Sequence, residues 1–246
     1  MKLLKAMAIA FSIYSKIPVP QFEWKEEDME YMMCFFPWIG GVIGLFFFGW
    51  AVLCEKFAVG NVCYALIGAA IPLMISGGFH VDGYMDTMDA FHSYQSREKK
   101  LEILKDSHIG AFAAIMLALY YMIDIAAISE IHTQKAVSAL AAVFFLARCF
   151  SGIAVMTLQP AKKEGLLYTF ASSAQKVRVK AALYFQAALC VVLMLLVSGW
   201  YGAAAIGAAL LSFFYFKKKS YKELGGITGD TAGFFVTVCE AAAAAA

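Results

Sequence analysis

The stretch MCFFPWIGGVIGLFFFGWAVLC, residues 33–54, decides the fold class, because it runs its whole length without one charged side chain. A helix needs about 20 consecutive apolar residues to cross the hydrocarbon core of a bilayer. The whole chain of 246 residues is 62% hydrophobic and only 15% charged, whereas about a quarter of the residues in a soluble domain are charged. These properties predict an all-α polytopic membrane protein with a single domain over residues 1–246.

Similar apolar runs follow along the chain and predict about seven transmembrane helices. Residues 1–17 are basic and then apolar, with no small-residue cleavage site after them. We therefore expect a short amphipathic helix there, lying on the membrane interface rather than being removed as a signal peptide. The seven spans are predicted at about 33–54, 61–79, 109–129, 136–158, 180–197, 201–216 and 231–246.

The distribution of positive charge predicts the orientation of these spans. In the successive connections, starting at the N-terminus, the numbers of Lys and Arg are four, one, four, one, five, none and four. Connections rich in Lys and Arg stay in the cytoplasm. The N-terminus and the segments 80–108, 159–179 and 217–230 are therefore expected on the cytoplasmic side of the cell membrane.

The strongest chemical signal is the string GGFHVDGYMDTMDA, residues 77–90. On a helix, the spacing of Asp82, Asp86 and Asp89 puts all three carboxylates on one face. Because like charges so close repel, a hard cation such as Mg²⁺ is the natural partner. A solvated acidic face on a short cytoplasmic helix is the alternative. His80 is a candidate base or metal ligand, or else a satisfied polar residue at the start of this helix.

A second cluster, residues 105–110, stands at the start of the third predicted span. Lys105, Ser107 and Gly110 combine a cation, a hydroxyl and a small residue at a helix N-terminus, where backbone N–H groups and the helix dipole favour a phosphate. In the alternative interpretation, the cluster only caps the helix and anchors it at the interface.

Two further polar residues lie in or next to predicted spans. Arg148 falls near the middle of the fourth span, where an arginine is costly unless it faces a cavity or a partner. A substrate phosphate would be such a partner, and a structural ion pair with Asp124 or Glu240 is the alternative. Asp230 enters the last span and either adds a fourth carboxylate to the metal site or caps the helix.

In their residues and in their order along the chain, these motifs resemble those of the cobalamin synthases, also called adenosylcobinamide-GDP ribazoletransferases. The resemblance covers most of the chain and rests on residues 77–89, 105–110, 148, 159–165 and 226–231. It implies a Mg²⁺-dependent membrane enzyme that joins α-ribazole or its 5′-phosphate to adenosylcobinamide-GDP, with release of GMP. Those two substrates and the lipid bilayer are the expected partners, nucleic acid is not, and the question of a homo-oligomer stays open.

On this hypothesis the polar residues divide into three roles. The metal ligands are Asp82, Asp86, Asp89 and Asp230. Lys105 and Arg148 clamp phosphate, with Ser107 and Gly110 beside them. A carboxylate or His80 takes the proton of the attacking hydroxyl.

The chain departs from the family pattern at three places, and two other functions stay open. Ala90 replaces a glycine, Ala111–Phe112–Ala113 replaces a polar or glycine-rich pair, and Thr237 stands where an acidic residue is expected. A CDP-alcohol phosphotransferase is one alternative, although Asp86 falls where that family needs Ala-Arg. A transporter is the other, with Arg148 and Asp124 as its intramembrane charges.

Overall fold

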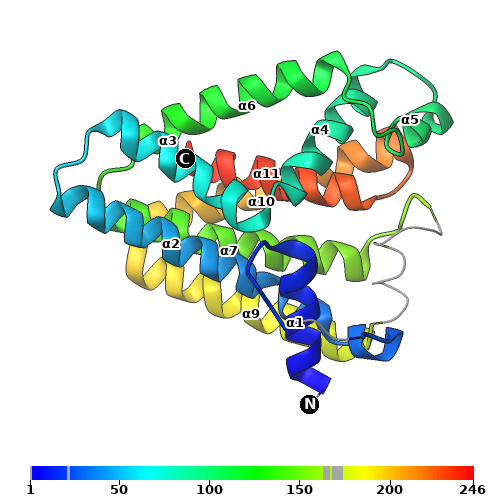
Figure 1. The fold of residues 1–246 in the computed structure, drawn as a ribbon, viewed down its shortest axis with the longest axis horizontal. Coiled ribbons are helices and arrows are strands. Elements are labelled where there is room, and N and C mark those ends of the chain that lie inside the picture. The colour runs from blue at the N-terminus through cyan, green and yellow to red at the C-terminus, as the bar shows by residue number, and fades with distance from the viewer. Residues whose placement is uncertain (1, 21–22, 163–166, 168–173) are drawn as a thin grey trace.

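The computed structural model describes residues 2–20, 23–162, 167 and 174–246, and every regular element in these ranges is a helix. Figure 1 shows them as a bundle of long helices that carries shorter helices at one end. The elements are α1 (Lys2–Tyr14), the 3₁₀ helices η1 (Glu26–Met29) and η2 (Met32–Cys34), α2 (Phe36–Lys56), α3 (Asn61–Ser76), α4 (Phe79–His92), α5 (Arg97–Ile103), α6 (Ala111–Ser129), α7 (Gln134–Thr157), α9 (Lys176–Ser198), α10 (Trp200–Leu224) and α11 (Gly229–Ala244).

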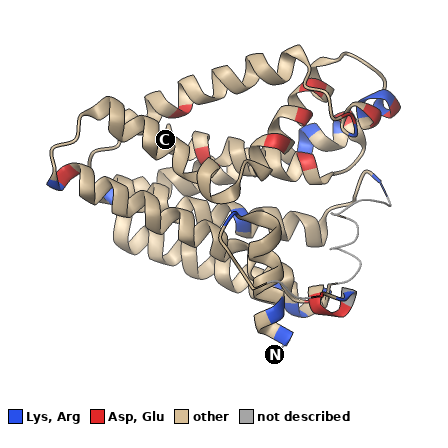
Figure 2. Cartoon of the chain, viewed as in Figure 1, with Lys and Arg blue, Asp and Glu red and all other residues tan. Residues whose placement is uncertain are grey.

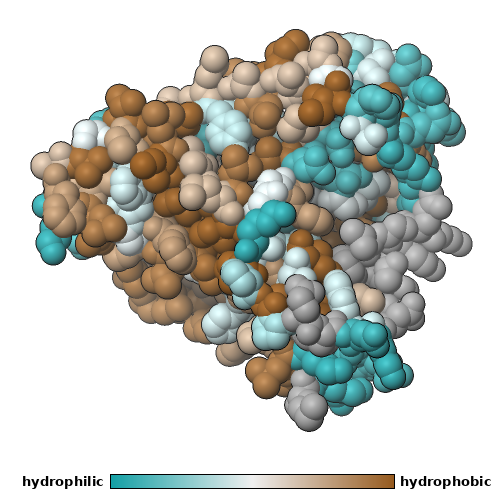
Figure 3. Space-filling model, viewed as in Figure 1, coloured by the Kyte–Doolittle hydropathy of each residue, from teal (hydrophilic) through white to brown (hydrophobic). Residues whose placement is uncertain are grey.

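Helix α7 forms the centre of the bundle. It packs against α2, α9, α10 and α11, and most of its residues are buried. Helices α6 and α9 expose most of their apolar side chains instead. In Figure 3, brown apolar surface covers much of the molecule on the side away from α4 and α5. An apolar exterior of this kind suits contact with lipid rather than with water.

Four helices in the described part of the chain are long and apolar enough to cross a membrane: α2, α6, α7 and α9. The pair α3 and α4 would make a fifth if it is one broken span. Helices form at all seven predicted positions, but the count of seven spans is not confirmed. Helix α11 has only 16 residues and α10 ends in a lysine-rich segment, and neither belongs to this set.

Two glycines end the predicted span 61–79 earlier than expected. Gly77 and Gly78 have φ angles of 65° and 84°, in the left-handed region that residues with a side chain rarely adopt. The chain bends by 97° between α3 and α4 at this point. Helix α4 is therefore a separate 14-residue helix, as predicted for the aspartate motif.

The N-terminal residues form the expected short helix. Helix α1 packs against α2, η1 and η2 through a buried face that includes Ala6, Ile9 and Ala10, and leaves Leu3 and Leu4 exposed. The exposed face thus carries apolar side chains as well, so the polar and apolar sides of α1 are not cleanly separated. Its position on a membrane interface stays a prediction.

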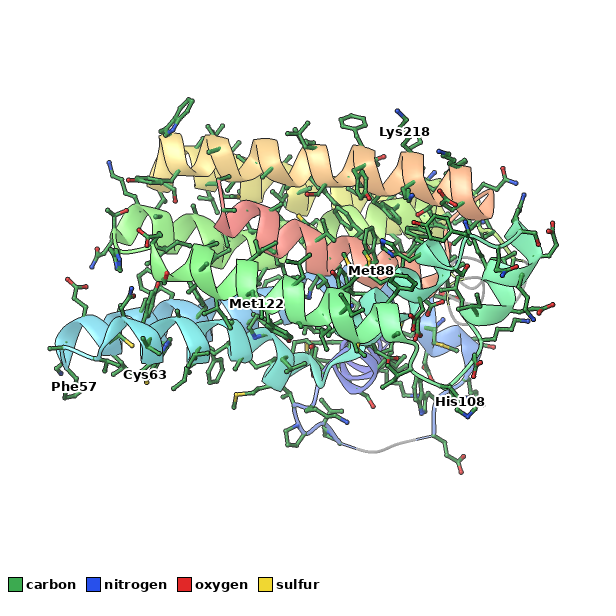
Figure 4. All side chains as sticks on the ribbon, turned by 90° about the horizontal axis from the view of Figure 1, so that it is seen from above. Phe57, Cys63, Met88, His108, Met122 and Lys218 are labelled. Carbon is green, nitrogen blue, oxygen red and sulfur yellow. The ribbon has the colours of Figure 1, made fainter. Side chains whose placement is uncertain are left out.

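Charged residues gather at one end of the molecule. In Figure 2 they cluster on α4, α5, the C-terminal part of α10 and the segment around η1, and few appear along the rest of the long helices. Figure 4 shows Phe57 and Cys63 at the end of the molecule opposite His108. The polar end carries the aspartate motif, and its cytoplasmic location stays a prediction from the positive charge.

The contact between α2 and α7 depends on small residues. A Cβ atom added to Gly40 would overlap the carbonyl group of Phe144, and one added to Gly44 would overlap that of Ala141. Glycines spaced four apart let two helix backbones approach closely, as they do in membrane helix pairs. The same helix offers an internal comparison, because nothing lies within 4 Å of a Cβ at Gly49.

We expect Gly44→Ala to destabilise the protein by about 1–3 kcal/mol, because the methyl group would force the two backbones apart. Gly49→Ala should leave stability unchanged or raise it slightly, since alanine is the better helix former. Thermal unfolding in detergent, followed by circular dichroism, measures both variants. Equal effects of the two substitutions would contradict the close α2–α7 contact.

Candidate active site

Helix α4 presents its three aspartates on one face because its other face is buried. Tyr84, Met88 and Phe91 are all buried. The ring of Tyr84 stacks on Phe234 of α11 at 5.9 Å with an interplanar angle of 10°, and Phe91 meets the same ring edge-on at 5.9 Å. This aromatic contact fixes the rotation of α4, so the direction of the carboxylates is set by packing.

Two glycines bring α4 against the start of α11. A Cβ on Gly83 would lie 2.8 Å from the carbonyl oxygen of Asp230, and one on Gly233 would lie 3.1 Å from that of His80. The backbones therefore touch at this crossing, and Asp230 comes next to the aspartates of α4. The predicted fourth carboxylate does lie beside the first cluster.

Asp230 is held in place by the local structure at the N-terminus of α11. The Thr228 hydroxyl accepts a hydrogen bond from the Thr231 backbone N–H at 3.2 Å, which caps the helix. The same hydroxyl lies 3.3 Å from Asp230 Oδ2 as a donor. The capping role is therefore taken by Thr228, and the Asp230 carboxylate faces the cavity described below.

The negative charges of the neighbouring carboxylates affect one another's pKa values. Helix α4 stands at the polar end and is not itself one of the four candidate spans. Burial, reinforced by the carboxylates of Asp82, Asp230 and Asp89, raises the pKa of Asp86 to about 7. Burial also raises the pKa of Asp230, against the opposing effect of its hydrogen bonds. This concentration of negative charge favours a cation or a cationic side chain nearby.

Asp89 makes a contact that the sequence analysis did not predict. Its two carboxylate oxygens accept hydrogen bonds from the backbone N–H groups of Gly110 at 2.7 Å and Ala113 at 2.8 Å, so Asp89 caps α6. A Cβ on Gly110 would lie 2.5 Å from Asp89 Oδ1. Gly110 therefore makes room for this cap. Each oxygen keeps a second lone pair, so the metal-ligand role of Asp89 stays a prediction beside this observed cap.

A cavity of about 450 Å³ opens beside the carboxylates, between α1, α2, α4, α7 and α11. Its polar lining includes His80, Asp82, Lys105, Lys162 and Asp230. Ser107 does not belong to this lining and lies exposed in the loop before α6. The structure thus brings together four residues that the sequence analysis proposed, and adds Lys162.

Lys162 reaches the cavity because two loops are joined. The Ala161 N–H donates to the carbonyl of Ile227 at 2.8 Å, and the Ile227 N–H donates to that of Gln159 at 3.0 Å. Lys162 Nζ also donates to the Leu101 carbonyl at 2.6 Å. The sequence marks Lys162 mainly as a topology signal within the 159–165 motif and does not name it as a site residue. The rest of that motif, 163–165, lies outside the described residues.

A second cavity, of about 520 Å³, lies on the other side of Phe79 and Asp82. It is bounded by α1, α3, α4 and α6, and Lys16 is its cationic residue. Asp82 and Phe79 line both cavities.

Arg148 does not face either cavity. Its side chain is 1% exposed, and Nη1 donates to Glu240 Oε1 at 2.7 Å and to the Phe144 carbonyl at 2.7 Å. The observed arrangement is therefore the structural ion pair with Glu240, which the sequence analysis gave as an alternative to a substrate phosphate. A phosphate clamp at Arg148 does not fit this geometry, because the guanidinium is buried between α7 and α11.

The residues offer part of a magnesium site rather than a complete one. Within the described ranges, no three His, Cys, Asp or Glu side chains are placed to bind one metal ion together. Mg²⁺ usually takes only one or two protein carboxylates, with waters and substrate phosphates as its other ligands. Two of the carboxylates of Asp82, Asp86 and Asp230 would meet that requirement, and the third is not needed as a ligand.

Comparison with known proteins gives consistent matches over the whole chain. A sequence model described as cobalamin-5-phosphate synthase matches residues 6–246. A protein of Lachnoclostridium phytofermentans named adenosylcobinamide-GDP ribazoletransferase is 44% identical over 240 residues, which cover 98% of this chain and 92% of that protein. A protein of Clostridium botulinum strain Alaska E43 with the same name is 31% identical, covering 97% of this chain and 94% of its own. No solved structure matches this chain.

The Arg148–Glu240 pair leads to a prediction that distinguishes a role of Arg148 in folding stability from a role in substrate binding. Arg148→Met alone should destabilise the protein by about 3–5 kcal/mol, because it leaves the Glu240 carboxylate buried without a counter-charge. The double variant Arg148→Met/Glu240→Leu should recover most of that loss. Thermal unfolding of the purified variants in detergent measures both effects.

The same variants test the phosphate role. If Arg148 serves only assembly, the double variant keeps turnover within a few-fold of the unaltered protein. A stable double variant without turnover would mean that the guanidinium acts on substrate after all.

Proposed function

The chain belongs to the cobalamin-5-phosphate synthase family, and on that premise we propose that it transfers α-ribazole, or its 5′-phosphate, onto adenosylcobinamide-GDP with release of GMP. This reaction would be the last assembly step of cobalamin biosynthesis. The observation that supports it best is the cavity that carries Asp82 and Asp230 together with Lys105 and Lys162. Carboxylates and ammonium groups in one wall suit a metal ion and a phosphate group side by side.

In this proposal Asp82 and Asp86, with Asp230 beside them, would hold Mg²⁺ against the diphosphate. When bound, the ion would neutralise phosphate charge and stabilise the leaving oxygen. Lys105 and Lys162 would bind phosphate oxygens from the same cavity. Asp89 supports the site indirectly, because it ties the end of α4 to the start of α6.

The chemical step is a substitution at phosphorus. A ribose hydroxyl of the nucleoside attacks the phosphorus on the cobinamide side and forms a new P–O bond. The bond to GMP breaks, and GMP leaves with the electron pair. A carboxylate at the cavity, Asp82 or Asp230, accepts the hydroxyl proton. Both line the cavity, and His80 lines it too but packs its ring among aromatic side chains.

We also propose that the active end faces the cytoplasm from the cell membrane. The positive charge distribution supports this orientation, and phosphorylated nucleosides and GDP-activated substrates are intracellular compounds. The two alternatives are not favoured. The family match covers the chain nearly end to end, and Asp86 stands where a CDP-alcohol phosphotransferase would need Ala-Arg.

The direct test is turnover by the purified protein in liposomes. Adenosylcobinamide-GDP, α-ribazole 5′-phosphate and Mg²⁺ are supplied, and GMP and the joined corrinoid are followed together. We expect the two products to form in equal amounts and only with the metal. GMP without joined corrinoid would identify a hydrolase and contradict the proposed acceptor.

We expect Asp82→Asn and Asp86→Asn each to lower kcat by at least about 10²-fold, since each removes charge that would orient the diphosphate. Glu55→Gln, an acid-to-amide change at the far end of the molecule, is the control and should keep full turnover. Mg²⁺ should also raise the unfolding temperature of the unaltered protein more than that of either variant. Equal stabilisation by Mg²⁺ in all proteins would contradict the metal assignment.

A further inference from the structure

The His80 side chain has an unusual environment for an imidazole. It is only 5% exposed, and neither Nδ1 nor Nε2 has a hydrogen-bond partner in the described part of the chain. Buried polar side chains are nearly always paired, because leaving one unpaired loses its hydration without replacement. His80 also lines the 450 Å³ cavity. Neither nitrogen has accessible surface in this arrangement, so a bound molecule would supply the partner once the ring turns toward the cavity.

The groups around His80 define what kind of molecule would fit. The ring of Tyr14 stacks over His80 at 6.1 Å, and the rings of Phe36 and Phe79 meet it edge-on at 5.6 Å each. All three aromatic residues line the same cavity, together with apolar side chains such as Met33. Aromatic and apolar walls with one polar group inside are suited to a flat heteroaromatic ring.

The cavity has the right size for only one of the two substrates. Pockets for small organic ligands usually measure about 300–1,000 Å³, and this one measures about 450 Å³. A nucleoside with a bicyclic base fits such a space. A corrin macrocycle with its side chains and nucleotide does not, so it would have to present its diphosphate from outside.

We propose that this cavity recognises the base of the nucleoside acceptor, and that His80 donates a ring N–H to the unsubstituted ring nitrogen of that base. The inference rests on the proposed function and names the part of the site that selects the acceptor. In every protonation state the imidazole retains at least one N–H donor. The rings of Tyr14, Phe36 and Phe79 contact one another, so the base lies against this aromatic group rather than between its rings. The sugar then extends toward Asp82 and Asp230 in the same wall.

This placement makes His80 a binding residue rather than the proton acceptor of the reaction. The two roles predict different kinetics. Loss of a base contact lowers kcat/KM for the nucleoside according to the chemistry of its base. Loss of a proton acceptor lowers kcat for every nucleoside by the same factor.

The test combines a substrate change with a residue change. One acceptor is the benzimidazole riboside phosphate, and the other is its indole analogue, in which C–H replaces the unsubstituted ring nitrogen. The unaltered protein should prefer the benzimidazole compound by about 10-fold or more in kcat/KM. His80→Phe should lower kcat/KM for the benzimidazole compound by a similar factor and abolish the preference. The KM for adenosylcobinamide-GDP should stay within about two-fold, and His80→Asn should restore part of the preference.

His132→Phe is the matched control, because His132 is exposed at the opposite end of the molecule, and it should keep the full preference. If His80→Phe does not fold, the preference of the unaltered protein and of His80→Asn decides. The proposal is overturned if the unaltered protein does not distinguish the two compounds. It is also overturned if His80→Phe slows both by the same factor.

Failure of the proposed function would look different. In that case the unaltered protein would form no GMP with any nucleoside. The base subsite is then decided by binding alone, because the benzimidazole compound should raise the unfolding temperature of the unaltered protein and not that of His80→Phe. No difference between them would overturn the subsite as well.

Discussion

The close approach of α4 to α11 is the contact on which the carboxylate site depends. At Gly83 the backbone of α11 occupies the space that a side chain would fill, and at Gly233 the backbone of α4 leaves only a tight fit for a Cβ atom. Only glycine permits two helices to come so near. The carboxylates of Asp82 and Asp86 therefore share one region with Asp230, although about 150 residues of chain separate them.

Several polar contacts hold the elements around this crossing. The Asp89 cap ties α4 to α6, the paired loops at Ile227 carry Lys162 to the cavity, and the Arg148–Glu240 pair ties α7 to α11. In apolar surroundings an unpaired polar group is costly, so such groups are usually found in pairs that also fix the packing. His80 departs from this pattern at both ring nitrogens, and it does so in the wall of a cavity rather than in a closed core.

The architecture separates apolar support from polar chemistry. Long helices with exposed apolar faces make up one part of the molecule, and the charged groups gather at the other end (Figures 2 and 3). The bend at Gly77 and Gly78 turns α4 away from α3 at this boundary. The chain thus changes from a helix suited to lipid into a helix that carries carboxylates, and two cavities meet at Asp82.

The sequence by itself determined the helical class, the common face of Asp82, Asp86 and Asp89, and the family motifs, because helix periodicity and composition are properties of neighbouring residues. Four of the proposed site residues, His80, Asp82, Lys105 and Asp230, do line one cavity. Only the tertiary structure decided that Asp89 caps a helix, that Arg148 pairs with Glu240, and that Lys162 belongs to the cavity. A carboxylate is suited to a metal, a helix cap or an ion pair, and a guanidinium to a phosphate or an ion pair. Its partner is chosen by which helices pack together, and that packing depends on contacts between residues far apart in the chain.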